Sequence, residues 1–191
     1  MLIALDVAIL PPPPVTRRAV ELSAALPAAE SQGLRLGAEM LPHITLTQHF
    51  VREDELDAVL DRVAAAVGGF DPLRLTVPGA GRSRSVVWMA IDRTPVLNDL
   101  HRELMDALRE FEREGGTPAA FVDGDGRPAD VEWVANFRRT AGYASFDPHV
   151  TLGHASALPE VERLTFDATT IAACHLGKFC TCRRVLRRWE L

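Results

Sequence analysis

Apolar residues recur along this chain of 191 residues with two different spacings. A short apolar run, or alternation of apolar and polar residues, predicts a strand, whereas apolar residues three and four positions apart predict an amphipathic helix. These patterns predict strands at 2–10, 43–51, 73–77, 84–92 and 149–153, with two further strands within 169–190. They predict helices at 15–26, 53–67 and 95–112, the last opened by Thr94-Pro95, and a short helix capped by Asp130.

The predicted elements occur twice in the same order, which indicates an internal duplication. A strand with Asp6, a helix and Pro-His-Ile-Thr-Leu at 42–46 are followed by a strand with Asp92, a helix and Pro-His-Val-Thr-Leu at 148–152. The distance from aspartate to histidine is 37 positions in the first copy and 57 in the second. The extra residues, about twenty, belong in 113–130, a stretch rich in glycine, proline and aspartate that predicts a loop.

Each repeated string carries a histidine and a threonine two positions apart. In a strand such residues share a face, so His43 and Thr45 point one way, and His149 and Thr151 repeat the arrangement. If the copies pack as a pseudo-twofold pair, both faces can meet in one cleft. We expect the ring nitrogens of the two histidines to lie roughly 5–8 Å apart there, enough for a phosphate and two hydrogen bonds.

That arrangement has a chemical use in phosphoryl transfer. One proton must leave on one side of phosphorus and another must arrive on the other side. Histidine, with an ordinary pKa of about 6.5, can do either near neutral pH. The hydroxyls of Thr45 and Thr151 can donate to the non-bridging phosphate oxygens. The motifs therefore predict acid–base catalysis by His43 and His149 that needs neither a metal nor another cofactor.

Composition narrows the class of substrate. The formal net charge is −5, which argues against a protein that coats duplex nucleic acid but allows a small nucleotide or an RNA end. Three cysteines suit a reducing cytoplasm better than a disulfide scaffold. The N-terminus lacks a basic segment, and no apolar run approaches the ~20 residues of a membrane span. We therefore expect a cytoplasmic monomer with no membrane partner.

The paired motifs and the repeated architecture resemble the two-histidine (2H) phosphoesterase superfamily, within it the 2′–5′ RNA ligase and cyclic phosphodiesterase branch. The resemblance implies an α+β fold that is bilobal and duplicated, with two antiparallel sheets facing a central cleft and helices outside. It implies one domain over 1–191, with lobes of about 1–80 and 81–191, chain crossover between them and an insertion at 113–146. It also implies hydrolysis or transfer at 2′,3′-cyclic or 2′–5′ phosphodiesters.

Residues outside the motifs are weaker candidates for substrate contacts. Arg84 precedes a predicted strand and could steer a phosphate. In the 113–146 insertion, Trp133, Arg138 and Tyr143 offer aromatic and cationic groups that could hold a nucleoside. The insertion is then a lid over the cleft. The alternative is that Trp133 and Phe137, four positions apart on one helical face, only anchor the insertion to the body.

The remaining histidines and cysteines are interpreted as structural. Strict alternation places His49 on the face of His43 and keeps His154 off the face of His149, and both suit exposed strand ends. His101 lies beside the apolar stripe of its helix. The spacing of Cys174, His175, Cys180 and Cys182 is not that of paired zinc knuckles, so small buried residues are favoured over a metal site.

Four functions remain open, and the first is favoured. They are hydrolysis of an RNA-like phosphodiester, 2′–5′ RNA ligation, binding of RNA or a nucleotide without catalysis, and metal-dependent hydrolysis with the histidines as ligands. Binding alone would not need two titrating groups, and the motifs lack carboxylates at ligand spacing. Ligation needs two RNA ends held together, whereas hydrolysis needs only water as the second reactant.

Overall fold

The chain forms nine strands and four α-helices, and most of them follow the hydrophobic spacing. The computed structural model describes all of residues 1–191. The strands are β1 (Leu2–Leu10), β2 (Ile44–Arg52), β3 (Leu73–Val77), β4 (Ala80–Ser83), β5 (Val86–Ala90), β6 (His149–His154), β7 (Leu164–Ala168), β8 (Thr170–Gly177) and β9 (Thr181–Glu190). The α-helices are α1 (Pro13–Ala25), α2 (Leu56–Val67), α3 (Pro95–Ala107) and α4 (Pro128–Thr140). The combination of helices with antiparallel sheets confirms the predicted α+β class.

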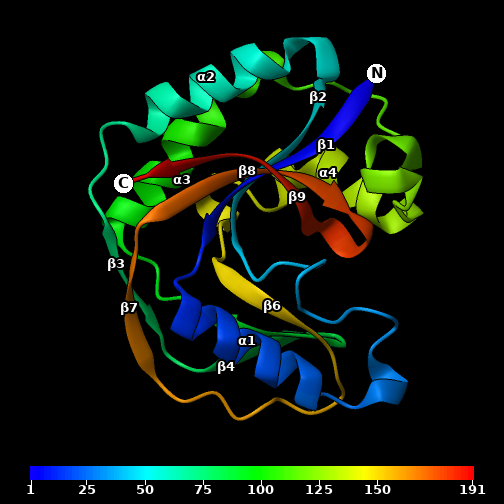
Figure 1. Cartoon of the computed structure of the whole chain (residues 1–191), viewed down its shortest axis with the longest axis vertical. Coiled ribbons are helices and arrows are strands. Elements are labelled where there is room, and N and C mark those ends of the chain that lie inside the picture. The colour runs from blue at the N-terminus through cyan, green and yellow to red at the C-terminus, as the bar shows by residue number, and fades with distance from the viewer.

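Antiparallel pairing joins the strands into three separate sheets. The largest sheet has the order β2-β1-β8-β9, the second has the order β4-β5-β6, and β3 pairs with β7. Figure 1 shows the four-stranded sheet in the upper half of the view, β4 and β6 in the lower half, and β3 and β7 along one side. Because β8 and β9 return to the sheet that β1 and β2 begin, the chain crosses from one half to the other and back.

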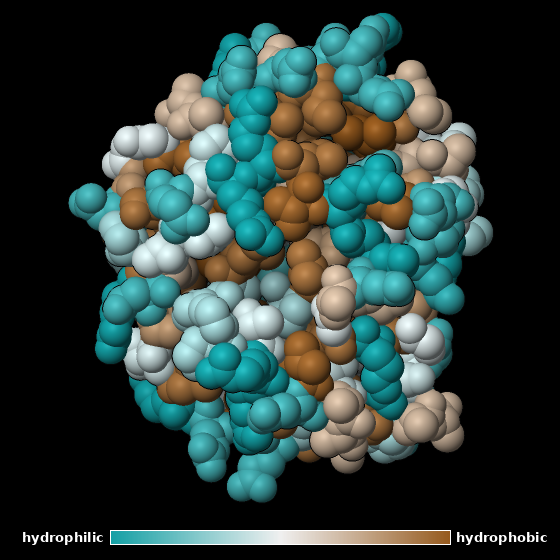
Figure 2. Space-filling view, viewed as in Figure 1, coloured by the Kyte–Doolittle hydropathy of each residue, from teal (hydrophilic) through white to brown (hydrophobic).

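The helices connect the two halves. Helix α1 leaves the four-stranded sheet after β1 but packs against β6, while α3 packs against both α2 and β2. A continuous core of 35 buried hydrophobic residues includes Val7 of β1, Leu100 of α3 and Val150 of β6, so the two halves share one interior. Helix α4 packs against the edge strand β2, and its Val134 is buried with Ala4 of β1, Phe50 of β2 and Leu176 of β8. None of the helices is both long and apolar enough to span a bilayer. Figure 2 shows hydrophilic residues around the rim of one face and apolar residues gathered in its upper half.

Two strands, β4 and β7, were not predicted, although β7 alternates apolar Leu164, Phe166 and Ala168 with polar residues. Strand β4 reads Ala-Gly-Arg-Ser and has no buried residue, so it lacks an apolar stripe. Strand β7 is placed by its pairing with β3, in which Phe166 lies opposite Leu75. The strand predicted over 84–92 is also shorter than expected, because β5 begins at Val86. Arg84 lies in the turn between β4 and β5 with a φ of 53°.

The start of α3 is as predicted, whereas that of α4 is not. Thr94 accepts a hydrogen bond from the Leu97 N–H at 3.2 Å, which caps α3. Helix α4 begins at Pro128, so Asp130 lies inside its first turn instead of capping it. The Asp130 carboxylate accepts from the backbone N–H of Arg127 at 3.0 Å and from that of Phe179 at 3.0 Å. Pro128 is the stronger start signal, because proline is favoured at the first helical position.

The first copy of the repeat contains a β-bulge next to its motif. In the β1–β2 ladder, Ala8 lies opposite Thr45 and Val7 lies opposite Thr47. Leu46 therefore has no residue opposite it and is the extra residue of a bulge. Its side chain is fully buried in the core.

The second copy contains a bulge at the corresponding place. In the β5–β6 ladder, Trp88 lies opposite Thr151 and Val87 lies opposite Gly153, which leaves Leu152 without an opposite residue. Gly153 has a φ of 147°, a backbone conformation that favours glycine. The bulge thus follows the motif threonine by one residue in both copies.

The register of these ladders corrects the repeat that the sequence indicated. Because the bulges coincide, Ala8 is equivalent to Trp88, and Asp6 is equivalent to Val86. The sequences around Asp6 and Asp92 are similar, but the two aspartates are not at equivalent positions of the two ladders. Asp92 lies beyond the end of β5, where its carboxylate is 3.8 Å from the Arg163 guanidinium.

Candidate active site

The two motif histidines are held in the same way. His43 Nδ1 lies 2.7 Å from the Leu41 carbonyl oxygen, and His149 Nδ1 lies 2.7 Å from the Asp147 carbonyl oxygen. A carbonyl can only accept, so Nδ1 carries a proton in both rings and Nε2 is the nitrogen left for chemistry. Each ring is therefore fixed by a carbonyl two residues before it.

The motif strands bring these histidines to one region of the molecule. Strand β2, which follows His43, contacts β6, which begins at His149. Both side chains are half-buried, and that of His43 keeps 11% of its surface exposed. Burial lowers the pKa of His149, the hydrogen bond to the Asp147 carbonyl opposes that shift, and the charge of His43 adds to the lowering. Contact between β2 and β6 thus places both rings in the same part of the molecule.

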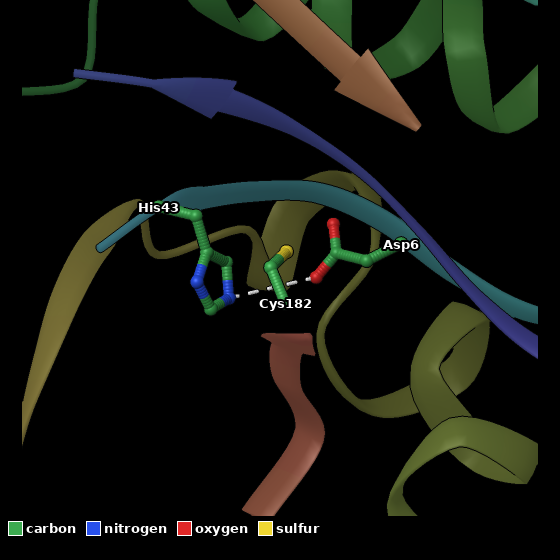
Figure 3. A group of neighbouring side chains, drawn as sticks. All are labelled: Asp6, His43 and Cys182. Atoms are coloured by element: carbon green, nitrogen blue, oxygen red, sulfur yellow. Dashed lines mark ion pairs between the residues drawn. The ribbon is translucent and has the colours of Figure 1, made fainter. Parts of the chain in front are cut away.

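A buried carboxylate lies beside His43. Asp6 of β1 is completely buried, and its Oδ2 lies 3.7 Å from His43 Nε2. The same oxygen accepts hydrogen bonds from the Thr45 hydroxyl at 2.8 Å and from Gln48 Nε2 at 2.7 Å. Burial raises the pKa of the Asp6 carboxyl, while His43 and the two hydrogen bonds oppose the shift. Figure 3 shows Asp6 and His43 with their carboxylate and imidazole directed toward each other.

The second half of the site lacks such a carboxylate. Val86 occupies the position equivalent to Asp6, and Trp88 occupies that of Ala8. The Trp88 ring lies 5.0 Å from the His149 ring, tilted by 35°. His149 therefore faces an indole where His43 faces a carboxylate. Sequence reasoning missed this asymmetry, although a charged residue inside the apolar run 2–10 is a signal for a functional carboxylate.

The first bulge overturns the expectation for His49. An extra residue shifts the alternation of side chains by one position, so Gln48 instead of His49 shares the face of Thr45. His49 is buried on the other face, where its ring contacts the Glu112 carboxylate and the Thr47 hydroxyl. It is neither exposed nor available to a substrate.

The second bulge brings His154 onto the face of His149, whereas strict alternation predicts the opposite face. His154 lies opposite Val86, two positions along β5 from Trp88, so it shares the face of His149. Its ring lies 5.9 Å from that of Phe179, which belongs to the turn between β8 and β9. The three-stranded sheet thus presents two histidines to the other half of the molecule.

Arg138 and Tyr143, which the sequence predicts as substrate contacts, have hydrogen-bond partners within the protein. Arg138 donates through Nε to both carboxylate oxygens of Glu112 at 2.8 Å, and its other nitrogens contact the Tyr143 hydroxyl and a carbonyl of α3. The Tyr143 hydroxyl donates to Asp106 at 2.6 Å, and the backbone N–H of Tyr143 donates to Nε2 of the buried His101 at 2.7 Å. These groups are satisfied within the protein and fasten the insertion to α3.

Trp133 is the insertion residue that connects to the site. Its indole N–H donates to Gln48 Oε1 at 2.9 Å, and Gln48 in turn donates to Asp6. The side chain remains partly in solvent, since 45% of Trp133 is exposed. Phe137 is buried one turn later and meets the Trp133 ring edge-on. Phe137 therefore anchors α4, and Trp133 lies where the insertion meets the site.

Arg84 lies at the wrong end of its sheet for the predicted phosphate contact. Ala90 pairs with His149 and Val86 pairs with His154, so the turn that carries Arg84 lies at the far end of the ladder from His149. Four strand residues separate the two ends, which is about 13 Å. That position does not favour contact with a phosphate at His149.

Cys174, His175, Cys180 and Cys182 do not come together as four ligands of one zinc ion. His175 Nε2 donates to the Ala120 carbonyl at 2.9 Å, and Cys180 Sγ lies 3.8 Å from the Asp130 carbonyl. Cys174 and Cys182 are fully buried in a small cluster with Ala8. These two cysteines thus lie on the same face of the four-stranded sheet as Asp6, which pairs with Cys174 across β1 and β8.

Comparison with known proteins identifies the family. A family model described as the 2′-5′ RNA ligase superfamily matches residues 11–176. The chain belongs to the 2′-5′ RNA ligase superfamily. Membership of this superfamily confirms the resemblance that the paired motifs indicated. No curated protein sequence matches the chain.

Solved structures show the same fold at low sequence identity. The crystal structure of E. coli LigT complexed with 3′-AMP has a TM-score of 0.65 and 19% identity, over 100% of this chain and 99% of that one. E. coli LigT complexed with NADP+ has a TM-score of 0.61 and 18% identity, with coverages of 100% and 99%. The protein TT0787 of Thermus thermophilus has a TM-score of 0.62 and 19% identity, with coverages of 99% and 98%. The fold of this superfamily member is therefore that of LigT.

Proposed function

We propose that the protein is a metal-independent phosphodiesterase that acts on 2′,3′-cyclic or 2′–5′ phosphodiester bonds of RNA ends or nucleotides. The observation that carries this proposal is the matched geometry of His43 and His149. Each ring is fixed through Nδ1 at 2.7 Å and leaves Nε2 free, and β2, which follows His43, contacts β6, which begins at His149. Two such nitrogens near one phosphate supply an acid and a base.

The surroundings of the two histidines give them different roles. The Asp6 carboxylate lies 3.7 Å from His43 Nε2, and a nearby negative charge favours the charged form of an imidazole, so we assign His43 as the general acid. His149 has no ion pair with a carboxylate, and burial lowers its pKa. It is neutral near pH 7 and is the general base.

The proposed reaction balances with water as the only second reactant. His149 takes a proton from a water molecule while the water oxygen bonds to phosphorus. The bond between phosphorus and one ribose oxygen breaks, and that oxygen receives the proton of His43. Exchange with solvent then returns a proton to His43 and removes one from His149. The same groups acting in reverse would form a 2′–5′ linkage, so ligation is the second activity to measure.

The motif threonines differ in their readiness to bind phosphate. Thr151 has no hydrogen bond from its hydroxyl to the protein and shares the face of His149, so we assign it to a non-bridging oxygen. The Thr45 hydroxyl donates its single proton to Asp6. Thr45 can donate to the phosphate only after that hydroxyl rotates. A nucleotide is the favoured ligand class, since E. coli LigT has been solved with 3′-AMP, NADP+ and ATP.

A direct assay tests the proposal. The purified protein is incubated, with EDTA present, with a 2′,3′-cyclic nucleotide, a 2′–5′ dinucleotide and an RNA that ends in a cyclic phosphate. We expect turnover of at least one, and a loss of about 100-fold or more in kcat for His43→Ala and for His149→Ala. His175→Ala, a histidine outside the site, is the matched control and retains activity. A protein that binds these ligands without turnover would be the non-catalytic alternative, and loss of turnover with EDTA would favour a metal-dependent hydrolase.

A further inference from the structure

We propose that Asp6, His43 and Cys182 form a binding site for one Zn²⁺ ion, and that zinc bound there inhibits the enzyme. One ligand atom from each residue lies within 4.8 Å of the others. Figure 3 shows the Cys182 thiol beside the His43 ring and the Asp6 carboxylate, which come from β9, from the residue before β2 and from β1. Only the inhibition rests on the proposed function, because metal binding can be measured without turnover.

The separation of the ligand atoms fits a tetrahedral ion. Asp6 Oδ2 and His43 Nε2 are 3.7 Å apart. Two ligands about 2.1 Å from zinc and at a tetrahedral angle are about 3.4 Å apart, so a small rotation of either side chain brings this pair to that separation. Three protein ligands leave the fourth position for water or a phosphate oxygen.

An unsatisfied oxygen points to a missing cation. Asp6 Oδ1 is buried and has no hydrogen-bond partner, and it is the only buried side-chain nitrogen or oxygen in the protein of which this is true. Native proteins rarely leave a buried carboxylate oxygen without a partner. A metal ion that also contacts Oδ1 would supply that partner, while Oδ2, the oxygen that faces His43, keeps its hydrogen bonds from Thr45 and Gln48.

The backbone already holds the other two ligands in place. The Leu41 N–H donates to the Cys182 carbonyl at 3.0 Å, and the Leu41 carbonyl accepts the proton of His43 Nδ1. A metal-binding histidine usually donates its second ring N–H to such an acceptor, which aims the free nitrogen at the ion. Leu41 thus links two ligands of the proposed site.

The donor set selects the metal and explains the inhibition. One oxygen, one nitrogen and one sulfur suit Zn²⁺, whereas Mg²⁺ and Ca²⁺ prefer oxygen ligands. The Cys182 thiol loses its proton on binding. Zinc would occupy His43 Nε2, the atom that delivers the proton in the proposed reaction, and a metal-bound nitrogen has no proton to deliver.

Cobalt spectroscopy tests the site without reference to activity. Co²⁺ is added to the reduced, metal-free protein in a buffer with a non-chelating reductant. We expect one equivalent to bind, with a thiolate-to-cobalt charge-transfer band that zinc removes. Cys182→Ala should abolish that band, and Cys180→Ala, which changes a cysteine outside the group, should keep it. Asp6→Asn is a second variant that should weaken binding, and thermal melting establishes that each variant is folded. Cobalt bound without the thiolate band, or a band that survives in Cys182→Ala, overturns the site.

Zinc titration of the enzyme tests the inhibition. We expect zinc to inhibit the wild type and Cys180→Ala equally, while magnesium does not. Cys182→Ala should keep its basal activity and need at least about tenfold more zinc, since even an outer-shell change costs that much affinity. Activation by zinc, or equal inhibition of Cys182→Ala, overturns the inhibitory role. If no substrate is turned over, the cobalt result still decides whether the site exists.

Discussion

Asp6 and Val86 occupy equivalent positions in the two halves of the molecule, and only one of them can carry a charge. This difference makes the environments of His43 and His149 unequal although their motifs are nearly identical. The acid and base roles proposed for the two histidines depend on it.

Asp6→Asn should lower kcat by about 100-fold and leave KM nearly unchanged, because the proton held by His43 loses its charged partner. The effect should depend on the leaving group. A nucleoside 3′-(p-nitrophenyl phosphate) expels an anion that needs no proton, so Asp6→Asn and His43→Ala should recover most of their activity on it. His149→Ala should not recover. The check is kcat for the two substrates side by side, and equal losses on both would remove His43 from the acid role.

The pH–rate profile should be bell-shaped, with an acidic limb below the ordinary histidine value of 6.5, because burial lowers the pKa of His149. Activity is then retained below pH 6.5 until His149 becomes protonated. Trp88→Leu should hydrate that ring and move the acidic limb upward toward 6.5, so activity falls more at low pH than at high pH. Trp189→Leu, a half-buried tryptophan of β9, is the control. An acidic limb that stays in place in Trp88→Leu would refute the assignment of His149.

Trp133→Ala should raise KM for a base-bearing substrate about fivefold, the equivalent of ~1 kcal/mol of stacking, with little loss of thermal stability. The small stability cost follows from the 45% exposure of this side chain. Trp133→Phe keeps an aromatic ring but removes the hydrogen bond to Gln48. We expect Trp133→Phe to keep the wild-type KM and to lower kcat, because Gln48 then orients Asp6 less firmly. A large fall in melting temperature with unchanged KM in Trp133→Ala would leave the residue only an anchoring role.

Glu112→Gln should lower the free energy of unfolding by about 2 kcal/mol at pH 7, between the values of exposed and buried ion pairs. Burial alone would raise the pKa of Glu112, but hydrogen bonds from His49 and Arg138 lower it from 4.5 to about 2. The stabilisation is therefore complete above pH 4.5 and is lost as pH falls toward 2. Urea denaturation should show the wild type and the variant converging over that window. Glu110→Gln, in the exposed pair with Arg62, should cost less than about 1 kcal/mol.

The elements of the fold could be predicted where periodicity was strong, and the motif residues could be found because they occur twice. Asp6 could not be paired with His43 from the sequence, since strand pairing brings together residues that are 37 positions apart. The predicted faces of His49 and His154 were wrong because strict alternation assumes a strand without a bulge. Gly153 is a signal for such a bulge in the second copy. The first copy has Thr47 at the equivalent position, and threonine does not indicate a bulge.

The bulge at Leu46 sets the phase of everything that follows it in β2. Deleting Leu46 would leave a regular ladder in which Gln48 still lies opposite Asp6 and His49 stays on the other face. The opposite follows if Leu46 is kept and the bulge is lost. The same sequence in a regular strand would place Thr47 opposite Asp6, His49 on that same face and Gln48 on the other face. The bulge therefore acts as a spacer that decides whether an amide or an imidazole shares the face of the buried carboxylate. In the other half, a regular strand that kept Leu152 would turn His154 away from the face of His149.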